Sequence, residues 1–96
     1  MVKELQLEGM TFKSVTLPTA NSVILLIQGA KANLGCGYFS MAVAAKMGDR
    51  FAIVRGVSSI EEVLAAPVAE CSPEAALCGV TAGMSGKEAL MLMENK

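Results

Sequence analysis

The spacing of apolar residues changes partway along the chain, and this change constrains the fold more than any other feature. Over residues 4–17, apolar side chains alternate with polar ones, with a break at Gly9 and a stop at Pro18. A period of two is typical of strands with one buried face and one solvent-exposed face, so we expect antiparallel strands here. Residues 23–27 are continuously apolar, as in a strand buried on both faces, and residues 31–38 are its predicted partner.

The first helix is predicted after Ser40, a residue type that favours the N-cap position. Phe39, Val43 and Met47 recur every four residues around it, which predicts that they form its buried face. Residues 48–49, a glycine and an aspartate, are expected to end it.

Three later helix starts have recognisable capping patterns. Short strands are expected between them, at residues 51–54 and 68–71. The patterns are Ser58 with Glu61, Ser72 with Pro73, and Ser85 with Glu88.

These elements predict an α+β fold of mixed α/β character. N-terminal antiparallel strands would join a mixed sheet packed against two to four helices. No linker or low-complexity segment divides the chain, so residues 1–96 are expected to be one domain. Within it, residues 2–17 would be the N-terminal strands and residues 22–96 the α/β core.

Apolar residues are more abundant than a chain of this length can bury. They make up 53% of the 96 residues before the nine glycines are counted, whereas an average domain has about 45–50% with glycine included. The surplus predicts a surface that another subunit covers, and we expect a homo-oligomer, a trimer or tetramer. A membrane is excluded as the cover, because the longest aliphatic run is residues 23–27 and a span needs about 18–20 residues.

Charge and residue usage exclude several further classes of protein. The net charge is −1 and the eight basic residues are scattered, so no nucleic-acid partner is expected. Histidine is absent, which removes the commonest general base and most zinc sites, and no metal site is expected. The three cysteines lack the spacing of a disulfide framework, and residues 1–8 lack the apolar core of a signal peptide. We therefore expect a cytoplasmic protein.

Cys36 lies between Gly35 and Gly37, and two interpretations of it stay open. In the first, it is a buried cysteine that acts as a small apolar residue, with glycines that allow tight packing. In the second, the open backbone around it admits a substrate, and the thiolate is a nucleophile or redox centre.

The second interpretation needs an activating cation, because the chain has no histidine to act as a base. Lys31 or Arg55 would be that cation. The two glycines and Tyr38 would form the binding surface beside the thiol.

Short motifs over residues 31–93 follow a characteristic order: Cys36-Gly37-Tyr38-Phe39, Met47-Gly48-Asp49, Gly56-Val57, Glu61 to Val68, and Gly79 to Leu90. Together they resemble the YunC-like domain of unknown function, which occurs in small bacterial and archaeal proteins. The resemblance implies an N-terminal β region used for tetramerisation, at roughly residues 2–17. It implies no catalytic residue. The family tends to have a bulky apolar residue where this chain has Gly35.

Three functions stay open. The first is a homo-oligomeric domain that binds a small molecule or a protein partner at a subunit interface. The second is a cysteine-dependent redox or nucleophilic activity centred on Cys36. The third is a purely structural or scaffold role. The sequence identifies neither a cofactor nor a ligand.

Overall fold

The computed structural model describes every residue from 1 to 96. It confirms an α+β fold that begins with antiparallel strands and has four helices, where two to four were expected. The elements in chain order are β1 (Val2–Leu7), β2 (Met10–Pro18), β3 (Val23–Gln28), β4 (Ala32–Gly35), α1 (Met41–Met47), β5 (Arg50–Val54), α2 (Ile60–Ala65), β6 (Val68–Cys71), α3 (Pro73–Leu77) and α4 (Gly86–Asn95).

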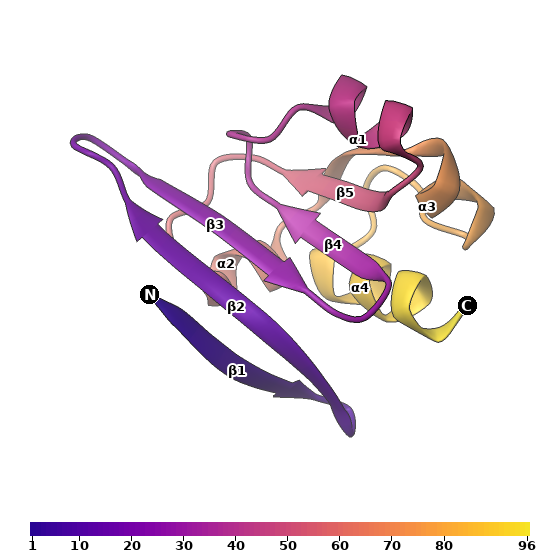
Figure 1. Ribbon diagram of the computed structural model, residues 1–96, viewed down its shortest axis with the longest axis horizontal. Helices are drawn as coiled ribbons and strands as arrows, with labels where there is room; N and C mark the ends of the chain where they lie inside the picture. Colours follow the sequence, from indigo (N-terminus) through magenta and orange to yellow (C-terminus); the bar gives the residue numbers. More distant parts are fainter.

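All six strands form one sheet, and their order in the sheet is their order in the chain (Figure 1). Neighbouring strands are antiparallel except β4 and β5, which are parallel. A parallel pair needs a crossover connection, and the segment containing α1 supplies it. The carboxyl ends of β4 and β5 therefore lie at the same edge of the sheet.

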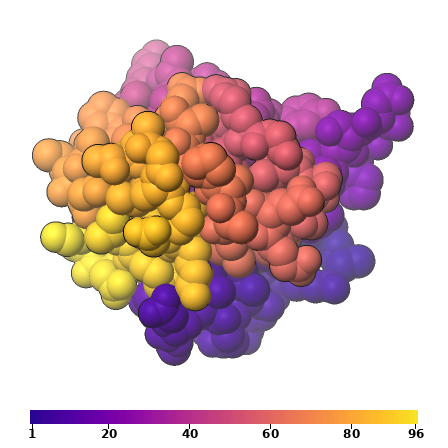
Figure 2. Space-filling view, turned by 180° about the vertical axis from the view of Figure 1, so that it is seen from behind, coloured from indigo at the N-terminus to yellow at the C-terminus, as the bar shows by residue number.

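Helices cover the two faces of the sheet unequally. Ala52 belongs to the main core, together with Val63 of α2 and Leu90 of α4. Its neighbour Ile53 points to the other face and packs with Ala44 of α1. Figure 2 shows the α2 and α4 side, where the yellow C-terminal helix lies across the molecule above the indigo N-terminal strands. None of the helices has the length and apolarity that crossing a bilayer would require.

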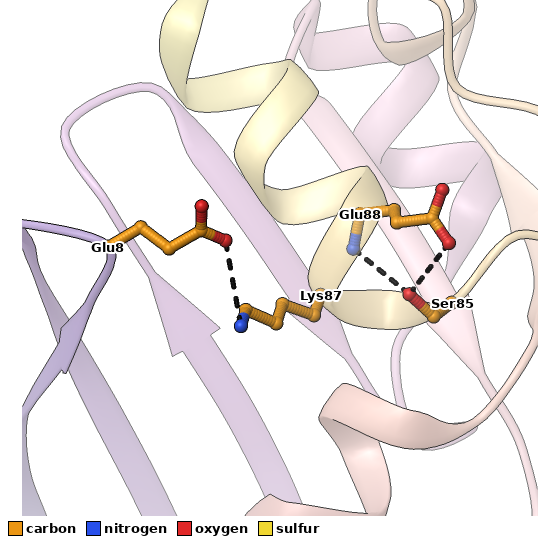
Figure 3. A network of polar contacts seen from close by, with 4 residues as sticks. All are labelled: Glu8, Ser85, Lys87 and Glu88. Atoms are coloured by element: carbon orange, nitrogen blue, oxygen red, sulfur yellow. Dashed lines mark hydrogen bonds and ion pairs between the residues drawn. The ribbon is translucent and has the colours of Figure 1, made fainter.

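The turn between β1 and β2 is fastened to the start of α4 (Figure 3). Glu8 Oε2 lies 3.5 Å from Lys87 Nζ. The hydroxyl of Ser85 accepts a hydrogen bond from the Glu88 backbone N–H at 3.1 Å, and this confirms the predicted helix start. The ion pair thus joins the N-terminal hairpin to the C-terminal helix.

The helix starting near Ser58 begins one residue later than predicted. Ser59 is the N-cap of α2, and its hydroxyl accepts a hydrogen bond from the Glu62 backbone N–H. Ser58 instead binds the Glu62 carboxylate through both its backbone N–H and its hydroxyl. Two adjacent serines and two adjacent glutamates give the same capping spacing in two registers, so the sequence pattern could not separate them.

The predicted buried face of the first helix is wrong. Val43 and Met47 are 59% and 69% exposed, and Ala44 is the buried residue of α1. Phe39 precedes the helix, which begins at Met41 with Ser40 as its N-cap. The small side chain of Ala44 allows the short helix to approach the sheet closely. Of the three predicted residues, only Phe39 packs against the core.

The predicted strand over residues 31–38 is shorter than expected. β4 ends at Gly35, and the chain turns where the Phe39 backbone N–H donates to the Cys36 carbonyl oxygen at 3.2 Å. This turn places Tyr38 on a loop rather than in the sheet.

Candidate functional site

A pocket lies where the carboxyl ends of β4 and β5 meet the start of β3. Its volume is about 310 Å³. Ligands commonly bind at the carboxyl ends of parallel strands, because the following loops can diverge there and leave a crevice. The lining residues are Ser22, Val23, Cys36, Gly37, Tyr38, Gly56 and Val57.

Cys36 is held in the pocket wall by β3. Its backbone N–H donates to the Leu25 carbonyl at 3.1 Å, and its Sγ accepts a hydrogen bond from the Leu25 backbone N–H at 3.3 Å. The residue is 4% exposed and belongs to the main core cluster. Cys36 therefore packs in the core and also borders the pocket.

Gly35 allows two aromatic rings to lie against the sheet. A Cβ at this position would lie 2.6 Å from Phe39 Cδ2 and 3.1 Å from Phe51 Cε1. The two rings pack with their centroids 5.5 Å apart and a 49° angle between their planes. The role of Gly35 is thus in packing rather than in binding. The bulky residue that is usual here in the family that the sequence resembles would require these rings to move.

Tyr38 is exposed at the pocket rim, and it connects the pocket to the hairpin of β2 and β3. Its hydroxyl lies 3.4 Å from Thr19 Oγ1. Thr19 in turn accepts a hydrogen bond from the Ser22 backbone N–H at 2.8 Å, and Ser22 lines the pocket. One wall therefore belongs to the hairpin and the opposite wall to the loops that follow the parallel strands.

Arg55 follows β5 and lies beside Gly37. A Cβ at position 37 would be 3.3 Å from Arg55 Nη1, so the guanidinium group covers this glycine. The other terminal nitrogen, Nη2, pairs with the Glu70 carboxylate of β6. Both side chains of this ion pair are largely exposed.

Lys31 is not brought to this pocket. It precedes β4, whereas Cys36 follows it, so the two residues lie at opposite ends of the strand. The backbone N–H of Lys31 donates to Glu94 Oε1 at 2.9 Å. Of the two cations proposed from the sequence, the structure places only Arg55 beside the loop that carries Cys36.

Four of the seven residues that line the pocket were not predicted from the sequence. Ser22, Val23, Gly56 and Val57 line it but belong to a hairpin and a loop far from Cys36 in the chain. The glycine at position 56 marks a turn after β5, where it adopts a positive φ of 71°. A glycine turn directly after a strand was the available signal, although such turns are common.

A second surface is the face of β1, β2 and β3 that is turned away from α2 and α4. We call it the open face. The register places Val2 opposite Val15, Val15 opposite Leu26, and Leu17 opposite Ile24. Side chains on directly paired residues share a face, so these five apolar residues lie together on it. Ile24 and Leu26 are half-buried against the two core clusters, and Val2 and Leu17 are the exposed members. Figure 1 shows no helix in front of these strands.

Residues 35–93 match the model of a family described as a domain of unknown function, DUF1805. The chain belongs to this family. The match agrees with the resemblance noted in the sequence and includes Cys36, Gly37, Tyr38 and Arg55. No curated protein matches the chain significantly.

A solved structure extends the likeness to almost the whole chain. The crystal structure of TA1206, a protein of unknown function from Thermoplasma acidophilum, is 27% identical in sequence and superposes with a TM-score of 0.92. The alignment covers 97% of this chain and 91% of that chain, and it therefore includes strands that precede the family match.

Proposed function

We propose that this DUF1805 protein is a homo-oligomeric domain, a trimer or tetramer, that binds a small molecule in the pocket at the ends of β4 and β5. The observation that carries the proposal is the open face. Val2 and Leu17 are 60% and 52% exposed there, on strands that otherwise fold normally into the sheet. Contiguous apolar surface of this kind on a small domain favours burial against another subunit.

The composition and the geometry support the same assembly. The apolar surplus of the chain needs a cover, and the open face provides a site for it. Polar pairs border the patch further along the strands, where Glu4 lies opposite Lys13 and Gln6 opposite Thr11. An apolar centre with a polar border is the usual composition of a subunit interface. The N-terminal strands that the family resemblance implies for tetramerisation contribute Val2, Val15 and Leu17.

The pocket would then lie close to the interface. The β2–β3 hairpin carries Leu17 and Ile24 on the open face and also supplies the pocket residues Ser22 and Val23. A subunit packed on these strands would order the hairpin, and thereby the pocket wall. This arrangement supports ligand binding beside a subunit interface rather than on an isolated monomer. The three cysteines are unpaired, which favours a cytoplasmic protein.

The test uses two leucine substitutions of matched chemistry. Leu17→Glu places a charge on the open face, and Leu77→Glu places one on α3, where Leu77 is 81% exposed. Sedimentation velocity at micromolar concentration should give oligomers for the wild type and Leu77→Glu, and a smaller species for Leu17→Glu. Equal masses for the two variants would contradict the assignment of the interface to the open face.

A second candidate function is thiol chemistry at Cys36. The supporting observation is that Cys36 lines the pocket and that its Sγ accepts a hydrogen bond from the Leu25 backbone N–H. Alkylation of the native protein, followed by peptide mass spectrometry, distinguishes the functions. Rapid labelling of Cys36 would favour thiol chemistry, whereas resistance until unfolding would assign the residue to packing. A scaffold role predicts that neither a thiol reagent nor a ligand reaches this pocket.

A further inference from the structure

Four of the residues that line the pocket have backbone N–H groups without an acceptor in the protein. None of the amides of Gly37, Tyr38, Gly56 and Val57 donates a hydrogen bond within the chain. Of the amides that flank them, Cys36 N–H and Phe39 N–H bind carbonyl oxygens and Ser58 N–H binds a carboxylate, whereas Arg55 N–H has no acceptor. The amides without an acceptor thus form one run in each of the two loops that line the pocket, at residues 37–38 and 55–57.

A cationic group adjoins the same two loops. Arg55 Nη1 covers Gly37 and has no hydrogen-bond partner, because the ion pair with Glu70 uses Nη2. None of the seven residues that line the pocket is acidic. Of the carboxylates that follow in the chain, Glu62 and Glu70 are bound by Ser58 and Arg55, and Glu61 lies on α2 outside the pocket lining. No carboxylate therefore lines the pocket, and Arg55 places a positive charge against one of its loops.

The loop after β5 already binds one anion. The backbone N–H of Ser58, next to Val57, donates to Glu62 Oε1 at 2.7 Å, and the Ser58 hydroxyl donates at 2.9 Å. These two hydrogen bonds hold the pKa of Glu62 below its usual range, although desolvation acts in the opposite direction. Exposed amides of such loops commonly form concave binding sites for anions.

We infer that the pocket binds its small molecule through an anionic group, a carboxylate or a phosphate. The amides of Gly37 and Tyr38 would bind it from one loop and those of Gly56 and Val57 from the other. Arg55 would supply the positive charge through its free Nη1, in competition with Glu70 for the guanidinium group. This inference rests on the proposed function, since it names the ligand class of the same pocket.

Amide resonances of the ¹⁵N-labelled protein provide the test. Sodium phosphate and sodium acetate are titrated separately at constant ionic strength, with acetamide as the neutral counterpart of acetate. The resonances of Gly37, Tyr38, Gly56 and Val57 should shift saturably with an anion and not with acetamide. The anion that saturates at the lower concentration identifies the preferred group.

Two charge variants should move the affinity in opposite directions. Arg55→Gln should raise the apparent Kd of the anion by about threefold to fivefold, as expected for a partly exposed charge. Glu70→Gln removes the competitor for Arg55 and should lower the Kd. Lys46→Gln, in the last turn of α1, makes the same charge change away from the pocket and should leave the Kd unchanged.

The outcomes separate this inference from the proposed function. Equal shifts with acetamide and acetate would overturn the anionic ligand and leave small-molecule binding in place. An Arg55→Gln effect no larger than that of Lys46→Gln would overturn the role of Arg55. No saturable shift with any probe would overturn the anion site, and the oligomer would still be tested independently by sedimentation.

Discussion

The Glu94 carboxylate, near the end of α4, accepts a hydrogen bond from the Lys31 backbone N–H at 2.9 Å. The same carboxylate accepts the N–H groups of Ala30 and Ala32, at 2.7 and 3.0 Å. A side chain at Gly29 would overlap it, so the turn between β3 and β4 is shaped around this group. Three successive amides around one carboxylate fasten the C-terminal helix to the sheet.

Glu94 should make stability depend on pH. Desolvation acts to raise the pKa of Glu94, but the hydrogen bonds from Lys31, Ala30 and Ala32 and the charge of Lys31 outweigh it, and its pKa lies below the ordinary 4.5. A lowered pKa in the folded state means that the contribution is present above about pH 4.5 and is lost as the pH falls through the folded value.

Glu94→Gln tests this contribution. The amide has one acceptor oxygen and no charge, so we expect the free energy of unfolding at pH 7 to fall by about 1 kcal/mol. Urea unfolding of both proteins from pH 7 to pH 3 should show the difference shrinking toward low pH. Glu74→Gln, on the short helix α3, serves as control. A difference that stays constant down to pH 3 would count against the hydrogen-bonded carboxylate.

Gly35→Ala should destabilise the protein. The added methyl group would lie 2.6 Å from Phe39 Cδ2, and the packing of Phe39 against Phe51 restricts how far the ring can move. Overpacking of this kind costs about 1–3 kcal/mol. Gly37→Ala is the matched control, because its nearest neighbour is the mobile Arg55 side chain at 3.3 Å. Thermal unfolding should give a clearly lower Tm for Gly35→Ala, and equal losses would refute the packing argument.

Ser72→Ala should be the most costly of the serine N-cap substitutions. The Ser72 hydroxyl is buried, donates to the Asp49 carbonyl at 2.6 Å, and accepts the N–H groups of Phe51 and Ala75 at 3.0 and 3.2 Å. Removal of the hydroxyl leaves these buried hydrogen-bonding partners unsatisfied, and we expect the free energy of unfolding to fall by about 2–3 kcal/mol. Ser85→Ala removes a more exposed cap and should cost about 1 kcal/mol. Denaturant unfolding measures both losses, and a larger loss of stability for Ser85→Ala than for Ser72→Ala would disprove the prediction.

Local patterns predicted the secondary structure well and the packing of one helix poorly. The starts of α3 and α4 follow from Ser72 with Pro73 and from Ser85 with Glu88, since capping depends on residues a few positions apart. The buried face of α1 depends on how closely the helix approaches β5. That distance cannot be predicted from the apolar character of Val43 and Met47.

The candidate site was predictable only in part. Cys36, Gly37 and Tyr38 are adjacent in sequence and could be grouped from their order. Their neighbours in the pocket come from the start of β3 and the end of β5, which meet because β4 pairs antiparallel with β3 and parallel with β5. Periodicity predicts strands but not their order in a sheet, so these relationships required the structure.

The central claim is that another copy of the chain covers the open face, and the molar mass in solution tests it most directly. Sedimentation equilibrium of the wild-type protein at micromolar concentration should give three or four times the 10.0 kDa of the chain. Leu17→Glu should reduce that mass while Leu77→Glu preserves it. A wild-type protein that sediments as a single 10.0 kDa species would contradict the account.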